Sequence, residues 1–265
     1  MSSQFLPLLR NEIAKAVRRK LTHFGFFVVG LVCVIIYFAA GQINSAATTN
    51  AWCYVGFSMQ MVFSHIGPIF IATFAAKLLS DETGTGTIHA LLAAPVGRWE
   101  LYLAKAAVGW LYMAALSLVA LVFSLALASI HYRFGAVADV AGVIYGQNEV
   151  LREFLVSYAL GWLPLSALVM YGLLVSTLVR TPGAAVSVAI STLFVLDFTK
   201  HLLGLDPYIF TRYMDYSWLV LQQMAQGMEY QWRPEVWPMA GLCGVSASIA
   251  FGAGLAVFVR QDLNH

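Results

Sequence analysis

The sequence predicts an all-α membrane protein with six transmembrane helices. Hydrophobic residues make up 60% of the 265 residues and charged residues only 11%, whereas a soluble domain carries about a quarter charged residues. The charged residues separate apolar runs of about 18 to 26 residues, which are long enough to cross about 30 Å of hydrocarbon as helices. The chain contains no internal repeat or linker, so residues 1–265 are predicted to form a single transmembrane domain.

The six predicted spans follow one another with polar interruptions. They cover residues 24–41, 51–76, 106–130, 154–179, 181–196 and 236–259. The fifth span is the least distinct, because Asp197, Lys200 and His201 lie near its end, and it is predicted to extend toward Leu205. An even number of spans places both termini on the same side of the membrane.

The distribution of Lys and Arg indicates the orientation of these spans. Ten basic residues lie in the segments on the side of the termini: Arg10, Lys15, Arg18, Arg19, Lys20, Lys77, Arg98, Lys105, Arg180 and Arg260. Five lie in the opposite segments: Arg133, Arg152, Lys200, Arg212 and Arg233. Because cytoplasmic segments carry the excess of Lys and Arg, we expect cytoplasmic N- and C-termini in a multi-pass protein of the cell inner (cytoplasmic) membrane.

The N-terminal region, residues 1–22, is predicted to form a helix that lies on the inner membrane surface. Leu6, Leu9, Ile13 and Val17 recur at helical spacing, and the basic residues of this region lie largely on other faces. The alternative is a plain basic anchor that holds the N-terminus in the cytoplasm. The two roles are compatible.

A polar insert between the second and third spans, residues 82–96, is longer than a connector requires. Ile88, Leu91 and Leu92 share one helical face within it. The residues around this face permit a sharp turn, a helix cap and a helix end: Gly84 and Gly86, then Thr85 or Thr87, then Pro95. The insert is therefore predicted to be a short cytoplasmic helix whose apolar face contacts the membrane surface or a groove of a soluble protein.

The sequence argues against chemistry within the chain itself. It has no Gly-Lys pair, hence no phosphate-binding loop, and no His-Glu-x-x-His zinc motif. Met61 and His65 are four residues apart and could share a soft metal, but copper would require further such ligands on neighbouring helices, so core packing is favoured. We expect no catalytic residue, no metal site and no nucleic-acid partner.

The insert resembles the signature of the ABC-2-type transporter permeases. The matching residues agree in order and spacing: Glu82, Gly86, Thr87, Ile88, Leu91, Leu92, Pro95, Arg98 and Lys105. Gly84 and His89 depart from it, since acidic residues are frequent there in the family. The N-terminal region is similar to the interfacial elbow helix of the bacitracin- and sodium-exporter-like branch, and the multidrug-exporter-like branch is the other candidate. The elbow residues are Asn11, Glu12, Lys15, Arg18 and Arg19.

The resemblance implies a membrane-spanning permease subunit of an ABC transporter, in the exporter class. Residues 82–96 would be the coupling helix, which docks on a separate ABC ATP-binding subunit. That subunit would hold ATP and Mg, and this chain would hold no cofactor. The permease would pair in the lipid bilayer with a second copy of itself or with a similar permease. The alternative function is a membrane anchor or scaffold that recruits a soluble ATPase without transport.

The segment between the fifth and sixth spans, residues 205–235, is rich in aromatic residues and includes Tyr213 and Trp218. The resemblance implies short re-entrant helices that form an outer gate here. Alternatively, the aromatic residues only mark the bilayer interface. Asp197 and His201, four residues apart, either line a polar pathway or reach water. The cargo, the direction of transport and the choice between homodimer and heterodimer stay open.

Overall fold

The computed structural model describes residues 5–43, 50–87, 97–139, 142–225, 228 and 233–260. Within these residues, six helices are long and apolar enough to cross a membrane, which confirms the predicted all-α membrane fold. The helices that form the six spans are α2 (Lys20–Ile43), α3 (Ala51–Gln60) with the π-helix η1 (Met61–Ile66) and α4 (Gly67–Gly84), α6 (Arg98–His131), α7 (Gln147–Leu178), α8 (Pro182–Leu202) and α10 (Arg233–Arg260).

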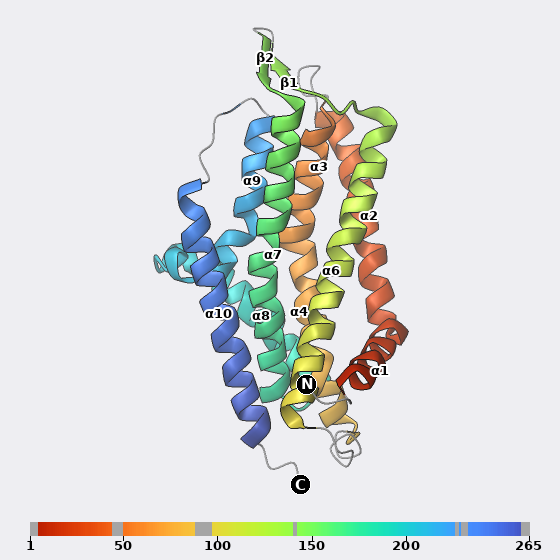
Figure 1. Ribbon diagram of the computed structural model, residues 1–265, viewed down its shortest axis with the longest axis vertical. Helices are drawn as coiled ribbons and strands as arrows, with labels where there is room; N and C mark the ends of the chain where they lie inside the picture. The colour runs from red at the N-terminus through yellow and green to blue at the C-terminus, as the bar shows by residue number, and fades with distance from the viewer. Residues whose placement is uncertain are drawn as a thin grey trace.

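The bundle has two distinct ends (Figure 1). The end that holds both chain termini, called here the terminal end, also holds the last turn of α4 and the first turn of α6. The opposite end carries an antiparallel hairpin of β1 (Val137–Asp139) and β2 (Gly142–Tyr145), in which Val137 pairs with Tyr145. This hairpin end was not predicted from the sequence, because the two strands are short and lie in a loop.

The core of the bundle is the pair formed by the second span and α7. Each has 61% of its apolar window buried, whereas α8 has only 17% buried. Polar side chains also link the two inner helices, since the Ser176 hydroxyl of α7 accepts hydrogen bonds from the backbone N–H groups of Leu79 and Ser80 in α4. Such bonds stabilise helix pairs in lipid, where water cannot replace them.

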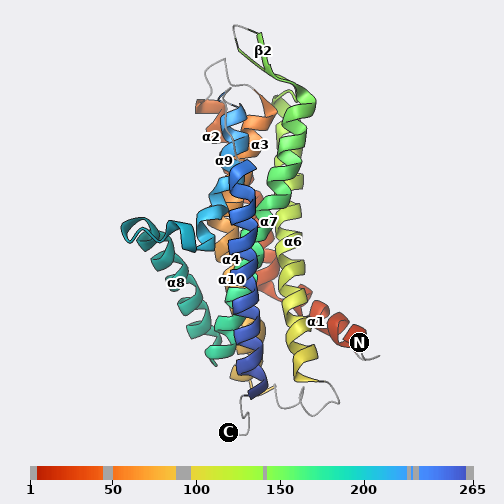
Figure 2. The same ribbon diagram turned by 60° about the vertical axis from the view of Figure 1, so that its left-hand side comes forward.

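The chain between the fifth and sixth spans folds back into the bundle. In Figure 2, α8 leans away from the other helices and ends near the middle of their length. It is followed by the 3₁₀ turns η2 (Asp206–Tyr208) and η3 (Phe210–Arg212), and by α9 (Tyr213–Ala225), which packs against α3 and α7. The short helices predicted in this segment are therefore present, and α9 lies among the spans.

Helix α1 (Phe5–Arg18) projects obliquely from the terminal end (Figure 2). Its buried face includes Leu8 and Glu12, and the helix packs against α6. Leu6 and Val17, at the two ends of the predicted apolar stripe, are exposed. The face of α1 that meets the protein is thus centred on an acidic residue, which the periodicity of the apolar residues did not predict.

Candidate functional site

Lys105 lies on α6, two turns inside the third span, and its side chain is completely buried. Its ammonium group has two carboxylate neighbours. Nζ donates to Glu12 Oε2 at 2.8 Å and forms an ion pair with Glu82 Oε2 at 2.7 Å. A buried lysine needs such partners, because an isolated charge in an apolar bundle is strongly unfavourable.

Lys15 completes the arrangement from the solvent side, with 36% of its side chain exposed. Its Nζ donates to Glu12 Oε1 at 2.6 Å and to Glu82 Oε1 at 3.0 Å. Each carboxylate therefore contacts both ammonium groups, and the formal charges cancel. Glu12, Lys15, Glu82 and Lys105 are called the ion cluster below.

Three helices from separate parts of the sequence build the ion cluster. Glu12 and Lys15 are one helical turn apart on α1, so both face the bundle. Glu82 lies in the last turn of α4, and Lys105 near the start of α6. The ion cluster thus joins α1 to the two helices that border residues 88–96.

The pKa values of the α1 members, which lie outside the membrane spans, reflect these contacts. Burial raises the pKa of the Glu12 carboxyl, but the charge and hydrogen bonds of Lys105 and Lys15 outweigh burial and hold the pKa below 4.5. Burial lowers the pKa of Lys15, but Glu12 and Glu82 raise it above 10.5. Because the pKa of Glu12 is lowered, its contribution to stability is lost as the pH falls; because the pKa of Lys15 is raised, its contribution is lost as the pH rises.

A second group of charges lies beside the ion cluster. Asp81, the neighbour of Glu82 on α4, forms ion pairs with Arg19 at 3.4 Å and with Lys77 at 3.6 Å. The Arg19 guanidinium also lies over the ring of Phe74, 5.8 Å from its centroid. Arg19 separates α1 from α2, so this group attaches the junction of those helices to α4.

The turn after α4 has the conformation that its glycines predict. Gly86 has a φ of 71°, a left-handed conformation that favours glycine. The Thr85 hydroxyl donates to Asp81 O at 2.7 Å, and the Thr87 hydroxyl donates to Glu82 O at 3.4 Å. Both threonines therefore bond to the end of α4. The predicted coupling-helix residues Ile88, His89, Leu91, Leu92 and Pro95 lie outside the described residues.

Arg98, the first residue of α6, lies on the other side of that segment. Its guanidinium donates to the backbone oxygen of Val259 at 3.0 Å, in the last turn of α10. A cation at this position also interacts favourably with the negative end of the helix dipole. The third span is thereby connected to the sixth at the terminal end.

The remaining predicted site residues lie elsewhere. Asn11 and Arg18 are exposed on α1. Tyr213 is buried, and its hydroxyl donates to Glu235 at the start of α10. Trp218 is completely buried. Asp197 pairs with Lys200 at 2.5 Å, and the side chain of His201 is not among those described.

Sequence reasoning named the members of the ion cluster in separate motifs but did not bring them together. Glu12 and Lys105 are 93 residues apart, and no local periodicity relates them. The available signal was Lys105 itself, because a lysine inside an apolar span requires a nearby anion. The sequence did not indicate that Glu12 and Glu82 supply that anion, because this depends on how the helices pack.

Comparison with models of protein families matched residues 8–198 to the family described as ABC-2 family transporter protein. The matched region contains the whole ion cluster, the first four spans and most of α8. A search of curated proteins found no match to the chain.

Proposed function

The chain belongs to the ABC-2 family of transporter proteins, and we propose that it is the permease of an exporter driven by a separate ABC ATP-binding subunit. That subunit would bind ATP and Mg²⁺, because this sequence has no phosphate-binding loop. Energy must then reach the spans through contact with the partner.

The observation that carries this proposal is the position of the ion cluster. It joins α1 to the end of α4 and to the start of α6, the helices on either side of residues 88–96. A force applied to that segment reaches both spans and the elbow helix together, because buried charge pairs separate only at a high cost. This arrangement supports a coupling role for residues 82–96.

We place the termini in the cytoplasm. The basic residues that the positive-inside rule assigns to the cytoplasm lie in the turns and helix ends at the terminal end. Single cysteines at Thr85 and Gln147 test this, since both positions are exposed and lie at opposite ends. A membrane-impermeant maleimide should label Gln147→Cys in intact cells and Thr85→Cys only after permeabilisation. Labelling of Thr85→Cys in intact cells would reverse the orientation.

We expect two permeases per transporter, either two copies or this chain with a similar one. The support is α8, which is the least buried span and exposes the apolar side chains of Phe194, Phe198 and Leu202. A partner permease or lipid would cover this face. Native mass measurement of the complex with its ATPase tests the stoichiometry, and a stable 1:1 assembly would contradict it.

The docking role is tested with two aspartates on the predicted coupling face, Leu91→Asp with Leu92→Asp. Burial of one leucine contributes roughly 1.5–3 kcal/mol, so the pair should remove several kcal/mol of docking free energy. The matched control is Val143→Asp with Ile144→Asp, an exposed apolar pair at the hairpin end.

The coupling variant should insert normally and fail to co-purify with the cognate ATPase, whereas the control should retain it. Equal recovery of the ATPase with both variants would refute coupling through this helix.

A second measurement, of ATPase turnover, separates the exporter from the scaffold alternative. A scaffold would retain the ATPase without changing its turnover, whereas an exporter permease should alter turnover when the two subunits are reconstituted in lipid.

A further inference from the structure

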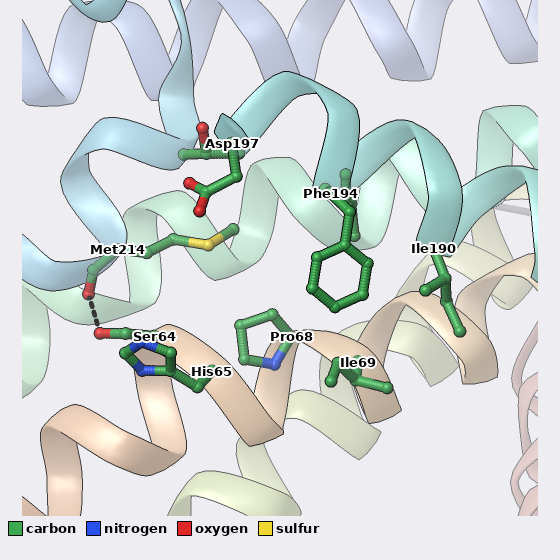
Figure 3. A pocket seen from close by; sticks show the side chains of 10 residues that line it. Ser64, His65, Pro68, Ile69, Ile190, Phe194, Asp197 and Met214 are labelled. Carbon is green, nitrogen blue, oxygen red and sulfur yellow. Dashed lines mark hydrogen bonds between the residues drawn. The ribbon is translucent and has the colours of Figure 1, made fainter. Parts of the chain in front are cut away.

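A pocket of about 300 Å³ lies between the second and fifth spans (Figure 3). Its walls come from η1 and the start of α4, from α8, and from η3 and the start of α9. In Figure 3, Phe194 and Asp197 of α8 face Pro68 of α4 and Met214 of α9. This volume lies at the lower end of the range for small-molecule sites.

Few polar side chains of the pocket wall are open to a ligand. The Ser64 hydroxyl already donates to Met214 O at 3.1 Å. Thr211 is 3% exposed and its Oγ1 is fully buried, so a ligand in the pocket does not reach that hydroxyl. The polar side chains that a ligand can reach are therefore those of His65, which is exposed, and Asp197.

Asp197 supplies an acceptor in an unusual place. Asp197 lies in the last two turns of α8, which ends near the middle of the bundle (Figure 2), and 61% of its side chain is exposed. Ionisable groups at such depth are costly and typically mark a functional site. Lys200 balances the charge at 2.5 Å, so the pocket offers hydrogen bonding without a net negative charge.

The π-helix brings His65 to the same pocket. The backbone N–H of Gly67 bonds to Val62 O, five residues earlier, which closes the wide turn. A Cβ at position 67 would lie 2.3 Å from that oxygen, so the turn requires glycine. Turns of this kind are frequent at functional sites. The structure thereby brings His65 of η1 and Asp197 of α8, which are 132 positions apart, to the same pocket.

We propose that this pocket binds a neutral amphiphile with a hydroxyl or amide head group. The head would lie between His65 and Asp197, where it can both donate and accept hydrogen bonds. The apolar body would lie against Pro68 and Phe194. A resident membrane lipid and a transported molecule both fit this chemistry. The proposal concerns binding by this chain alone and goes beyond coupling to an ATPase.

The test uses the purified full chain in phosphatidylcholine nanodiscs and a photoactivatable monoacylglycerol, with mass spectrometry of the cross-linked peptides. We expect labelling of peptides from η1 or α8 that excess unlabelled monoacylglycerol prevents. His65→Leu removes one hydrogen-bonding partner of the head group and should lower labelling about fivefold. Ile190→Phe, which narrows the pocket, should lower it as well. The control is Thr199→Val, because that hydroxyl already bonds to Val195 O.

A second probe separates specific binding from partition into lipid. The methyl ester of the same photoactivatable fatty acid has the same apolar chain but no donor, so it should label the pocket less. Equal labelling by the two probes, or undiminished labelling of Ile190→Phe, would overturn the proposal. Neither result would affect the docking test above.

The same preparation distinguishes the two sources of the ligand. Recovery of a hydroxyl-bearing or amide-bearing lipid from the purified wild type, and its loss from Ile190→Phe, would identify a resident lipid. A rise in ATPase turnover when monoacylglycerol is added to the wild-type complex, absent from Ile190→Phe, would identify a transported molecule. Both results support the site.

Discussion

Replacing Lys105 with methionine should destabilise the protein strongly. Methionine keeps an apolar stem of similar length but removes the ammonium group, which is completely buried and contacts Glu12 and Glu82 at 2.8 and 2.7 Å. Removal of one partner from a buried ion pair costs about 3–5 kcal/mol, because the other charge stays buried without compensation. Lys15 still contacts both carboxylates, so the lower limit, about 3 kcal/mol, is expected.

Thermal unfolding of the purified chain in detergent, followed by tryptophan fluorescence, measures this loss. For a protein near this size, 1 kcal/mol corresponds to about 2–4 °C in Tm, so Lys105→Met should lower Tm by roughly 6–12 °C. Lys77→Met is the matched control. The Lys77 side chain is 33% exposed and its Nζ lies 3.6 Å from Asp81. Such a surface pair contributes under about 1 kcal/mol.

A double-mutant cycle with Glu12→Gln shows whether the effect belongs to the ion cluster. Glu12→Gln removes one of the two buried carboxylates that Lys105 contacts. The double variant should therefore lose less stability than the sum of the single variants. A Tm for Lys105→Met equal to that of Lys77→Met, or strict additivity with Glu12→Gln, would refute the assignment of the ion cluster as a structural link.

Two further predictions concern the same end of the bundle. Gly86→Ala should lower Tm by about 2–4 °C, because its φ of 71° costs a residue with a Cβ about 1 kcal/mol, and no atom of the described residues lies within 4 Å of that Cβ. Gly183→Ala, which has no described neighbour within 4 Å and no positive φ, should not lower Tm. Tm should fall as pH drops below 4.5, because Glu12 has a depressed pKa and its contribution is lost on protonation; Glu12→Gln should flatten this dependence, and the exposed Glu149→Gln should not.

Local features of the sequence were sufficient for the spans and the turn. The six apolar runs correspond to the six membrane-spanning helices, because hydrocarbon accepts only helices whose backbone groups bond internally. The Gly86 turn follows from the absence of a Cβ at one position. These outcomes depend on neighbours in the sequence, so the packing of the bundle did not have to be known. The coupling helix predicted for residues 82–96 stays a prediction beyond Thr87.

Aromatic residues of the 205–235 segment show where local reasoning was insufficient. Trp218 is completely buried between the spans, whereas Tyr208 is 74% exposed. Their composition alone indicates either a gate or an interfacial belt, because amphipathic rings suit both places. The difference arises because α8 ends near the middle of the bundle and α9 then packs against α3 and α7.

The sequence by itself determined that this protein crosses the membrane six times, that its second span ends in a glycine turn, and that its inserts resemble those of a known permease family. Only the tertiary structure decided that Lys105 lies between Glu12 and Glu82, and that His65 and Asp197 line one pocket. Hydrophobicity and backbone freedom act along a few consecutive residues. The partner of a buried charge depends instead on which helices become neighbours, and that is a property of the whole bundle.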